Sequence, residues 1–305
     1  MPKTIFITGT TSGFGKATVE LFAAKGWNVA ATCRRADMAG MFANLPNVRM
    51  YHLEVTDDAQ VAQVATQVIA DFGGVDVILN NAGYCLMGSL EGSSMAQIRA
   101  QFETNTFGVI AVIKAFLPHL RARKAGMIFN VSSASAIANY PFVAAYGASK
   151  WAVRGISESL FIELAPFGIK VKTIYPGLHS TSIFTKLDPA IGDGAAAYAP
   201  YLDNFLAVQS GVANGGSPQQ VAQTVWDAVV KNNDKRDYLV NRDAKILAFL
   251  KRWLSDSQWK RMNLGSIMGK PSRMMLAIAN WQINGTKPLD IVIDPKMTDV
   301  TDSKP

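Results

Sequence analysis

The sequence predicts an α/β fold, a doubly wound parallel sheet in a single domain, from three observations. Short apolar runs alternate with stretches of helical periodicity, several of these runs stop at glycine or asparagine, and nothing resembling a linker interrupts the chain before residue 178. Runs that are apolar on both faces are typical of strands buried in a parallel sheet. Such strands need crossover helices, which cover both faces of the sheet.

The expected strands are spaced so that a helix fits between most of them. They cover residues 4–8, 27–32, 48–55, 75–79, 127–131, 169–175 and 237–240. The main helices are expected from Gly15 to Ala24, from Thr56-Asp57-Asp58 to Phe72, and over residues 95–123, 146–166 and 218–230. We expect residues 1–243 to form the catalytic and cofactor-binding domain, with 178–217 as a substrate lid, and residues 244–305 to form a helical C-terminal extension.

Composition narrows the classes of function. The chain has 305 residues, of which 49% are hydrophobic and 17% charged, and its net charge of +7 is spread without a block of like charges. A nucleic-acid partner is therefore not expected. Cys33 and Cys85 form no motif for a metal or a disulfide framework. Since neither a signal peptide nor a membrane span is recognisable, we expect a cytoplasmic protein.

A glycine-rich turn, Thr8-Gly9-Thr10-Thr11-Ser12-Gly13-Phe14-Gly15, follows the first expected strand. Glycines there let the backbone turn tightly and approach a pyrophosphate, which the N-terminus of the next helix attracts. The spacing Gly-x3-Gly-x-Gly differs from the common GxGxxG pattern. A bland glycine-rich turn therefore remains the alternative when the motif is taken alone.

Tyr146 and Lys150 lie four residues apart and so share one helix face. A phenol ionises near pH 10, and a neighbouring ammonium favours its phenolate, which suits acid–base catalysis near neutrality. Taken alone, such a pair is more often a surface pair. Ser132 and Ser133 follow the fifth expected strand, at the carboxyl edge where ligands of open α/β sheets bind.

In combination, these motifs resemble the short-chain dehydrogenase/reductase family in its short, single-domain form. The resemblance covers residues 4–180 and, more loosely, residues up to about 241; it rests on TGxxxGxG at 8–15, NNAG at 80–83, Asn105, Ser133, YxxxK at 146–150, and PG with a threonine at 176–181. It implies that Tyr146 is the general acid or base, that Lys150 lowers its pKa and binds the nicotinamide ribose, that Ser133 holds the substrate oxygen, and that Asn105 positions a proton-relay water.

Cofactor preference is indicated after the second strand, where an acid would bind the ribose 2′-hydroxyl of NAD. This chain has Cys33-Arg34-Arg35 instead, and arginines suit the 2′-phosphate of NADP(H). Glu54-Val55 replaces the Asp-Val usual in the family. The motifs and the resemblance together give the expected cofactor-binding residues: Gly9, Thr11, Ser12, Gly13, Phe14, Gly15, Arg34, Arg35, Glu54, Val55, Asn81, Ala82, Gly83, Tyr146, Lys150, Pro176, Gly177 and Thr181.

The expected function is NADP(H)-dependent hydride transfer on a hydrophobic alcohol or ketone, by a homodimer or homotetramer. The alternative is a catalytically weak NADP(H)-sensing regulatory protein, although such proteins would be expected to lose Tyr146 or Lys150.

We expect His52, His119 and His179 to have structural or surface roles. The basic, amphipathic stretch 245–254 is expected to pack against its own domain or a partner subunit, with a membrane surface as the alternative. The candidate substrate-pocket residues are Tyr84, Leu86, Met87, Tyr140, Phe142, Leu178, Ile183 and Phe184.

Overall fold

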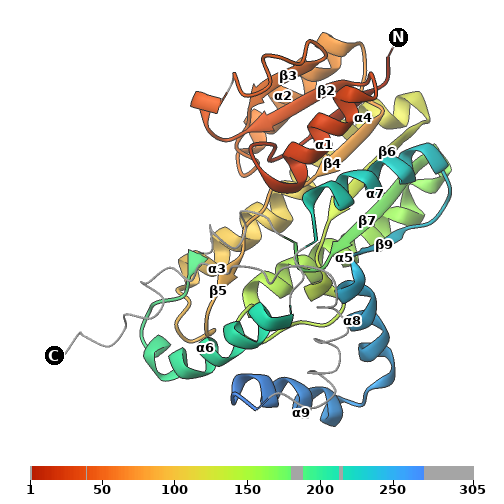
Figure 1. Cartoon of the computed structure of the whole chain (residues 1–305). Helices are drawn as coiled ribbons and strands as arrows, with labels where there is room; N and C mark the ends of the chain where they lie inside the picture. The colour runs from red at the N-terminus through yellow and green to blue at the C-terminus, as the bar shows by residue number, and fades with distance from the viewer. Residues whose placement is uncertain (1, 39, 180–187, 213–215, 271–305) are drawn as a thin grey trace.

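A central parallel sheet organises the protein (Figure 1). The computed structural model describes residues 2–38, 40–179, 188–212 and 216–270. Within them, seven strands pair in parallel in the order β3-β2-β1-β4-β6-β7-β9. The strands are β1 (Thr4–Ile7), β2 (Asn28–Cys33), β3 (Val48–His52), β4 (Val77–Asn80), β6 (Gly126–Val131), β7 (Ile169–Pro176) and β9 (Asp237–Val240). The doubly wound α/β fold is confirmed.

Helices cover both faces of the sheet. On one face lie α1 (Gly13–Ala24) and α7 (Pro218–Lys231). The other face carries α2 (Asp58–Phe72), α4 (Gly108–Arg123) and α5 (Ala144–Glu163). The expected start of the second helix is confirmed, because the Asp57 side chain caps α2 by accepting a hydrogen bond from the backbone N–H of Gln60.

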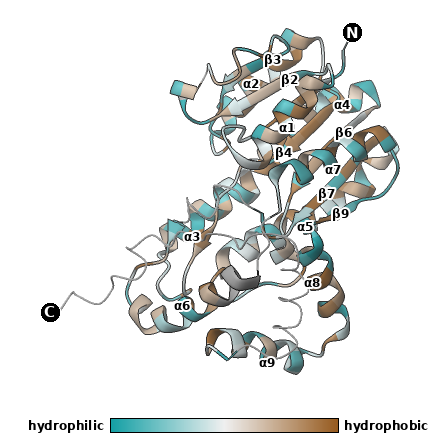
Figure 2. Cartoon of the chain, viewed as in Figure 1, coloured by the Kyte–Doolittle hydropathy of each residue, from teal (hydrophilic) through white to brown (hydrophobic). Residues whose placement is uncertain are grey.

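Alternation along the strands gives each face of the sheet its own core. In β1, Phe6 points to the face of α2, α4 and α5, where its ring centroid lies 4.7 Å from that of Phe116. Ile5 and Ile7 point to the other face, toward α1 and α7. Figure 2 accordingly shows the strands as hydrophobic ribbons between more polar helix surfaces. Burial on both faces explains why these strands are nearly continuous apolar runs.

The helix expected over residues 95–123 is interrupted. Instead of one continuous helix, α3 (Met95–Phe102) is followed by a π-helical turn (Glu103–Phe107) and then by α4. The wider turn is compatible with the tertiary contacts of Asn105, whose side chain is fully buried. The expected helical region is thus present, although helical periodicity carries no signal for the π-helical turn inside it.

Further elements lie beyond one end of the sheet (Figure 1). They are β5 (Leu86–Met87) paired with β8 (Asp188–Pro189), and the helices α6 (Ala195–Val212), α8 (Arg242–Trp253) and α9 (Asp256–Ile267). The segment expected to be a lid thus contains an 18-residue helix, α6. The extension is helical as far as it is described. Its proposed boundary at residue 243 falls inside α8 and stays a prediction.

Candidate active site

The glycine-rich turn after β1 is tied to the loop after β4 by hydrogen bonds. The Thr8 hydroxyl accepts from the backbone N–H groups of Asn81 and Ala82, each over 2.9 Å. The Asn81 side-chain amide donates to the carbonyl oxygens of Thr8 and Gly9, also over 2.9 Å. These bonds hold the carboxyl ends of two neighbouring strands as one rigid unit.

Two glycines make this arrangement possible. Gly9 has a φ of +70°, and a Cβ atom there would lie 2.9 Å from the Cα atom of Ala82. A Cβ atom on Gly15 would overlap the Gly9 carbonyl. The helix α1 begins at Gly13, and its first turn carries no acidic side chain. Its free N–H groups and positive dipole end therefore fit a pyrophosphate, as the sequence predicts.

Arg34 and Arg35 lie side by side after β2, with exposed guanidinium groups. Arg34 is 3.8 Å from the Glu54 carboxylate, and Arg35 is 3.8 Å from Asp37. Such exposed pairs are weak, so an incoming phosphate can replace them. Val55 is buried against Gly108, which fixes the loop that carries Glu54.

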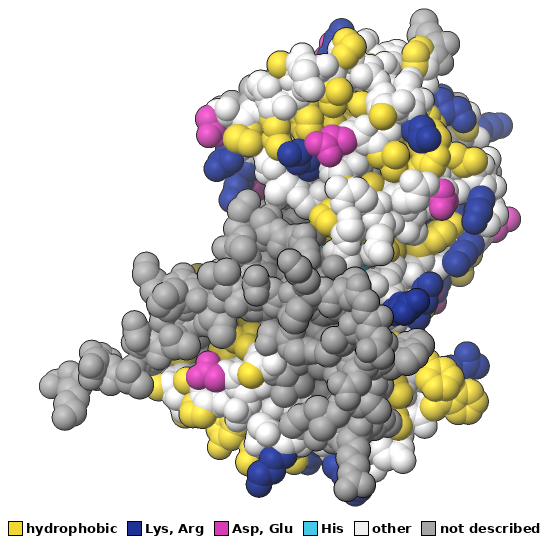
Figure 3. Space-filling model, in the orientation of Figure 1, with side chains coloured by type: hydrophobic (Ala, Val, Ile, Leu, Met, Phe, Trp, Pro, Cys, Tyr) yellow, Lys and Arg dark blue, Asp and Glu magenta, His cyan; other side chains and the backbone are white. Residues whose placement is uncertain are grey.

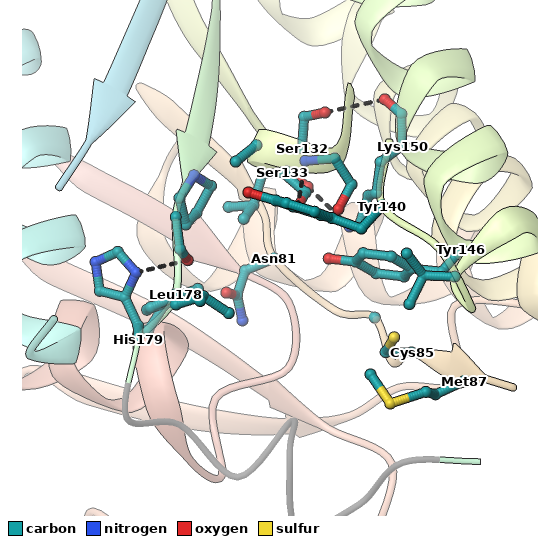
Figure 4. A pocket seen from close by; sticks show the side chains of 18 of the residues that line it. Asn81, Cys85, Met87, Ser132, Ser133, Tyr140, Tyr146, Lys150, Leu178 and His179 are labelled. Carbon is teal, nitrogen blue, oxygen red and sulfur yellow. Dashed lines mark hydrogen bonds between the residues drawn. The ribbon is translucent and has the colours of Figure 1, made fainter. Parts of the chain in front are cut away.

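Tyr146 and Lys150 lie one turn apart on α5, where both enter the same cleft (Figure 4). The Lys150 Nζ atom is 5.9 Å from the centroid of the Tyr146 ring and donates a 2.9 Å hydrogen bond to the Val131 carbonyl. The Ser132 hydroxyl donates to the Lys150 carbonyl, which fixes β6 against α5. The Ser133 side chain lines the same cleft as Tyr146. The structure therefore brings the predicted serine, tyrosine and lysine together.

Burial dominates the electrostatics of this group. It raises the pKa of Tyr146 above its ordinary value, while the hydrogen bond to Ser133 acts in the opposite direction. Burial lowers the pKa of Lys150 to about 8. The lowering of the Tyr146 pKa by Lys150 stays a prediction, in which the positive charge of an oxidised nicotinamide would add to that of the lysine.

Three hydrogen bonds fix the Asn105 side chain inside the π-helical turn. Its Oδ1 atom accepts the Tyr84 backbone N–H over 3.1 Å, and its Nδ2 atom donates to the Tyr84 carbonyl (3.0 Å) and the Ser149 hydroxyl (3.2 Å). A Cβ atom built on Gly83 would lie 2.8 Å from Asn105 Oδ1 and 3.5 Å from Lys150 Nζ. Asn105 is therefore close to Lys150, where the sequence predicts it.

A cleft of about 1080 Å³, counting its space open to solvent, joins these groups. Many of the predicted site residues line it: Phe14, Asn81, Gly83, Ser133, Tyr146, Lys150, Pro176 and Gly177. Its apolar wall comes from β5, the segment before α5, and α6. This wall consists of Cys85, Met87, Tyr140, Val143, Phe205 and Leu206.

Of the candidate substrate-pocket residues, Met87, Tyr140 and Leu178 line the cleft. Three others, Tyr84, Leu86 and Phe142, are not among its lining residues. Leu86 points away from it, toward Ala145 and Ala190, because successive strand residues face opposite sides. Phe142 packs behind the wall, against Phe205. Thr181, Ile183 and Phe184 lie outside the described residues.

Sequence reasoning missed His179, Cys85, Val143, Phe205 and Leu206 as cleft residues. His179 is buried rather than at the surface; its Nδ1 atom lies 2.9 Å from the Gly177 carbonyl, and its ring meets that of Phe14 edge-on at 5.1 Å. Its position two residues after Pro176-Gly177 was the available signal. No comparable signal marked Phe205 or Leu206, because their contribution depends on how α6 folds over the cleft.

The segment that directly follows β9 holds the loop after β7. The Leu178 N–H donates to the Asp243 carboxylate over 2.5 Å, and the Leu178 carbonyl accepts from the Asn241 amide over 3.2 Å. Burial raises the pKa of Asp243 to about 6. The loop lining one side of the cleft is thus anchored by residues from the end of the sheet.

The family profile described as short chain dehydrogenase matches residues 3–192. The chain belongs to this family. It is 34% identical, over 84% of its length and 94% of the relative, to the 3-ketodihydrosphingosine reductase of Bacteroides thetaiotaomicron. As members of this family are oxidoreductases, the chain is an oxidoreductase of the short-chain dehydrogenase/reductase type.

Solved structures agree on the fold. A short-chain dehydrogenase from Streptomyces avermitilis matches with a TM-score of 0.75 at 30% identity, over 88% of this chain and 98% of that one. ElxO, solved with NADP bound, matches with a TM-score of 0.68 at 25% identity, over 79% and 97%. Similar structures hold either NADP or NAD, which supports a nicotinamide cofactor.

The described part of the chain also bears on membrane spans and metal sites. None of its helices combines the length and apolar character needed to cross a membrane. Its His, Cys, Asp and Glu side chains form no group of three that could hold a metal ion.

Proposed function

We propose that this protein transfers a hydride between NADP(H) and a hydrophobic alcohol/ketone pair, with Tyr146 as the general acid or base. The observation that carries the proposal is the convergence of Ser133, Tyr146 and Lys150 on one cleft beside the glycine-rich turn. When bound, the nicotinamide supplies the hydride for reduction or accepts it in oxidation. The protein must then bind the carbonyl, supply a proton and exclude water.

Each of the three side chains has a distinct task in this proposal. Ser133 and Tyr146 together hydrogen-bond the substrate oxygen, and the Tyr146 phenol gives up its proton as the oxygen becomes an alkoxide. The raised pKa of Tyr146 keeps the phenol protonated, which suits the acid role in reduction. Lys150, fixed by the Val131 carbonyl, holds positive charge next to the phenolate that forms. Asn105 is close enough to Lys150 to order a water that returns the proton.

The apolar wall supports a hydrophobic substrate. Met87, Val143, Phe205 and Leu206 face the same cleft as Tyr146, and desolvation of an apolar body against them would contribute binding energy. The relative named for reduction of a 3-keto compound supports the ketone direction. NADP(H) as the preferred cofactor is supported by Arg34 and Arg35, whose cations suit the 2′-phosphate, and by Cys33 at the position where an NAD-preferring site has an acid.

We also propose a homo-oligomer. The outer faces of the segment from the π-helical turn through α5 and the 3-10 turn beyond it leave large apolar side chains exposed, among them Phe107, Trp151, Ile162 and Phe167. A two-fold pairing of these faces would bury them. The mass of the particle in solution tests this point.

The test of function is NADPH or NADH oxidation with a panel of ketones, in wild type and two variants. Tyr146→Phe should lower turnover by roughly 10²–10⁴-fold while NADPH affinity stays within a few-fold. Tyr140→Phe, which removes another buried phenol from the same cleft, is the matched control and should keep its activity. Full activity of Tyr146→Phe would refute the assignment. NADPH binding without turnover of any ketone would favour the regulatory alternative.

A further inference from the structure

Helix α8 has two unlike faces. Ala244 and Leu247 are buried on one, in a cluster that includes Ala134 and Ala138 of the main domain. Phe249 and Trp253 project from the other and are 64% and 68% exposed, with ring centroids 6.3 Å apart. Together the two rings form an exposed apolar patch, which is a candidate contact surface.

Cations surround these rings. Lys245 and Arg252 are exposed on the same side of α8, and the Arg252 guanidinium lies 5.9 Å from the centroid of a Trp253 ring. The only acidic residue of α8, Asp243, is held against Leu178. In Figure 3, hydrophobic side chains project beside Lys and Arg at the lower right, where α8 runs. This face of α8 therefore combines aromatic rings with positive charge.

The next helix continues the pattern. Lys260 and Arg261 of α9 are exposed, as are Leu264 and Met268 at its C-terminal end. Its first-turn acid, Asp256, pairs with Lys251 over 3.2 Å. Both helices of the extension thus expose apolar side chains beside cations.

We propose that the exposed face of α8, with Phe249, Trp253, Lys245 and Arg252, docks on the surface of a lipid bilayer that contains anionic headgroups. Aromatic rings settle at the level of the headgroups, while Lys and Arg bind the negative surface. A second copy fits less well, since a two-fold contact through this face would bring like charges together.

The surface is connected to the cleft. Tyr140, which lines the cleft, also packs in the cluster that seats α8. Docking through α8 would therefore hold the cleft close to the bilayer, where a hydrophobic ketone partitions. This consequence rests on the proposed function, whereas membrane docking itself does not.

The experiment is sedimentation of the full-length protein with vesicles of phosphatidylcholine, with and without phosphatidylglycerol. Wild type should bind the anionic vesicles, and added salt should weaken the binding. The double variant Lys245→Glu/Arg252→Glu should lose at least about fivefold in affinity for each charge removed. The control variant, Arg121→Glu/Lys231→Glu, makes the same change in net charge elsewhere on the protein. It should bind the anionic vesicles more tightly than Lys245→Glu/Arg252→Glu does.

A second pair of variants tests the rings. Phe249→Ser/Trp253→Ser should abolish sedimentation, whereas Leu90→Ser/Val230→Ser, at exposed apolar residues elsewhere, should not. All variants should keep their activity on a water-soluble ketone, so that failure of docking and failure of catalysis are told apart. The proposal would be overturned if wild type did not bind anionic vesicles, or if both α8 variants bound them as tightly as wild type does. A smaller particle for the ring variant, with no vesicle binding by wild type, would identify the face as an interface between copies.

Discussion

Gly83 and Asn105 touch so closely that no side chain fits between them: a Cβ atom on Gly83 would lie 2.8 Å from Asn105 Oδ1. This oxygen also accepts the Tyr84 N–H, so it cannot move aside without breaking that bond. The absence of a side chain at residue 83 therefore lets the loop after β4 lie against the π-helical turn, beside Lys150.

Gly83→Ala should displace Asn105 and impair catalysis by up to roughly 10²-fold, the scale for a misplaced catalytic group. Gly155→Ala is the control, because apart from the neighbouring backbone of α5 itself no heavy atom lies within 4 Å of its Cβ position. That variant should keep its activity and gain about 0.5–1 kcal/mol of stability from helix propensity. Steady-state kinetics and thermal unfolding measure both effects, and equal activity of the two variants would contradict the prediction.

Arg34→Ala should weaken NADPH binding by roughly 1.5–3 kcal/mol, the range for a charged hydrogen bond. It should leave NADH binding nearly unchanged, because only NADPH carries the 2′-phosphate that Arg34 would bind. The Arg34 side chain is 76% exposed and is held only by Glu54 at 3.8 Å, so the fold should not suffer. Arg35→Ala, whose partner is Asp37, shows whether one arginine or both bind the phosphate. Calorimetric titration with both cofactors would refute the role of Arg34 if the losses were equal.

The contribution of Asp243 to the free energy of unfolding should fall as pH rises from about 4 to about 6. Burial raises the pKa of Asp243 to about 6, so within that window the native state binds more protons than the unfolded state. Asp243→Asn should remove this dependence, which amounts to about 2 kcal/mol between the two limits. Chemical unfolding across the pH range measures it, with Asp227→Asn, at an exposed carboxyl group, as the control. If the free energy of unfolding changed with pH in the same way for wild type and Asp243→Asn, the raised pKa of Asp243 would be disproved.

The value of kcat/KM for NADPH should decline above a pH of about 8. Burial lowers the pKa of Lys150 to that value, so its positive charge is lost as pH rises through it. This kinetic constant reports ionisations of the free enzyme, which makes it the right measure. An activity that stays level until pH about 10, where ordinary lysines ionise, would show that Lys150 keeps its charge.

The strands were predictable because their residues are buried on both faces, which leaves an unbroken apolar signal. β9 matches its predicted residues 237–240, and β7 ends at Pro176, one residue past the prediction. The π-helical turn at 103–107 was not predictable, since it follows from the contacts of Asn105 with Tyr84 and Ser149, which are distant in sequence. Helix α6 lay in a segment expected to be a lid, although the alanines at its start favour a helix.

Within the candidate site, motif residues at strand ends were predictable and the apolar wall was not. Strand ends meet at one edge of any parallel sheet, so Gly9, Asn81 and Ser133 had to converge. Met87 faces the cleft and Leu86 does not. Which of the two side chains faces the cleft depends on how the two-residue strand β5 is oriented beside it. The sequence around Leu86 and Met87 has too little alternation of apolar and polar residues to predict which side chain faces the cleft.

The parallel order of the strands has a consequence for how the protein acquires its site. Ile5 pairs with Val77, and Thr173 pairs with Asp237, so neighbours in the described sheet are joined by long crossovers rather than hairpins. Contacts between residues so distant in sequence form slowly during folding. The turn after β1 and the catalytic side chains on α5 meet only once those pairs exist. NADPH added to a refolding mixture should therefore bind late and trap the finished fold rather than speed its formation.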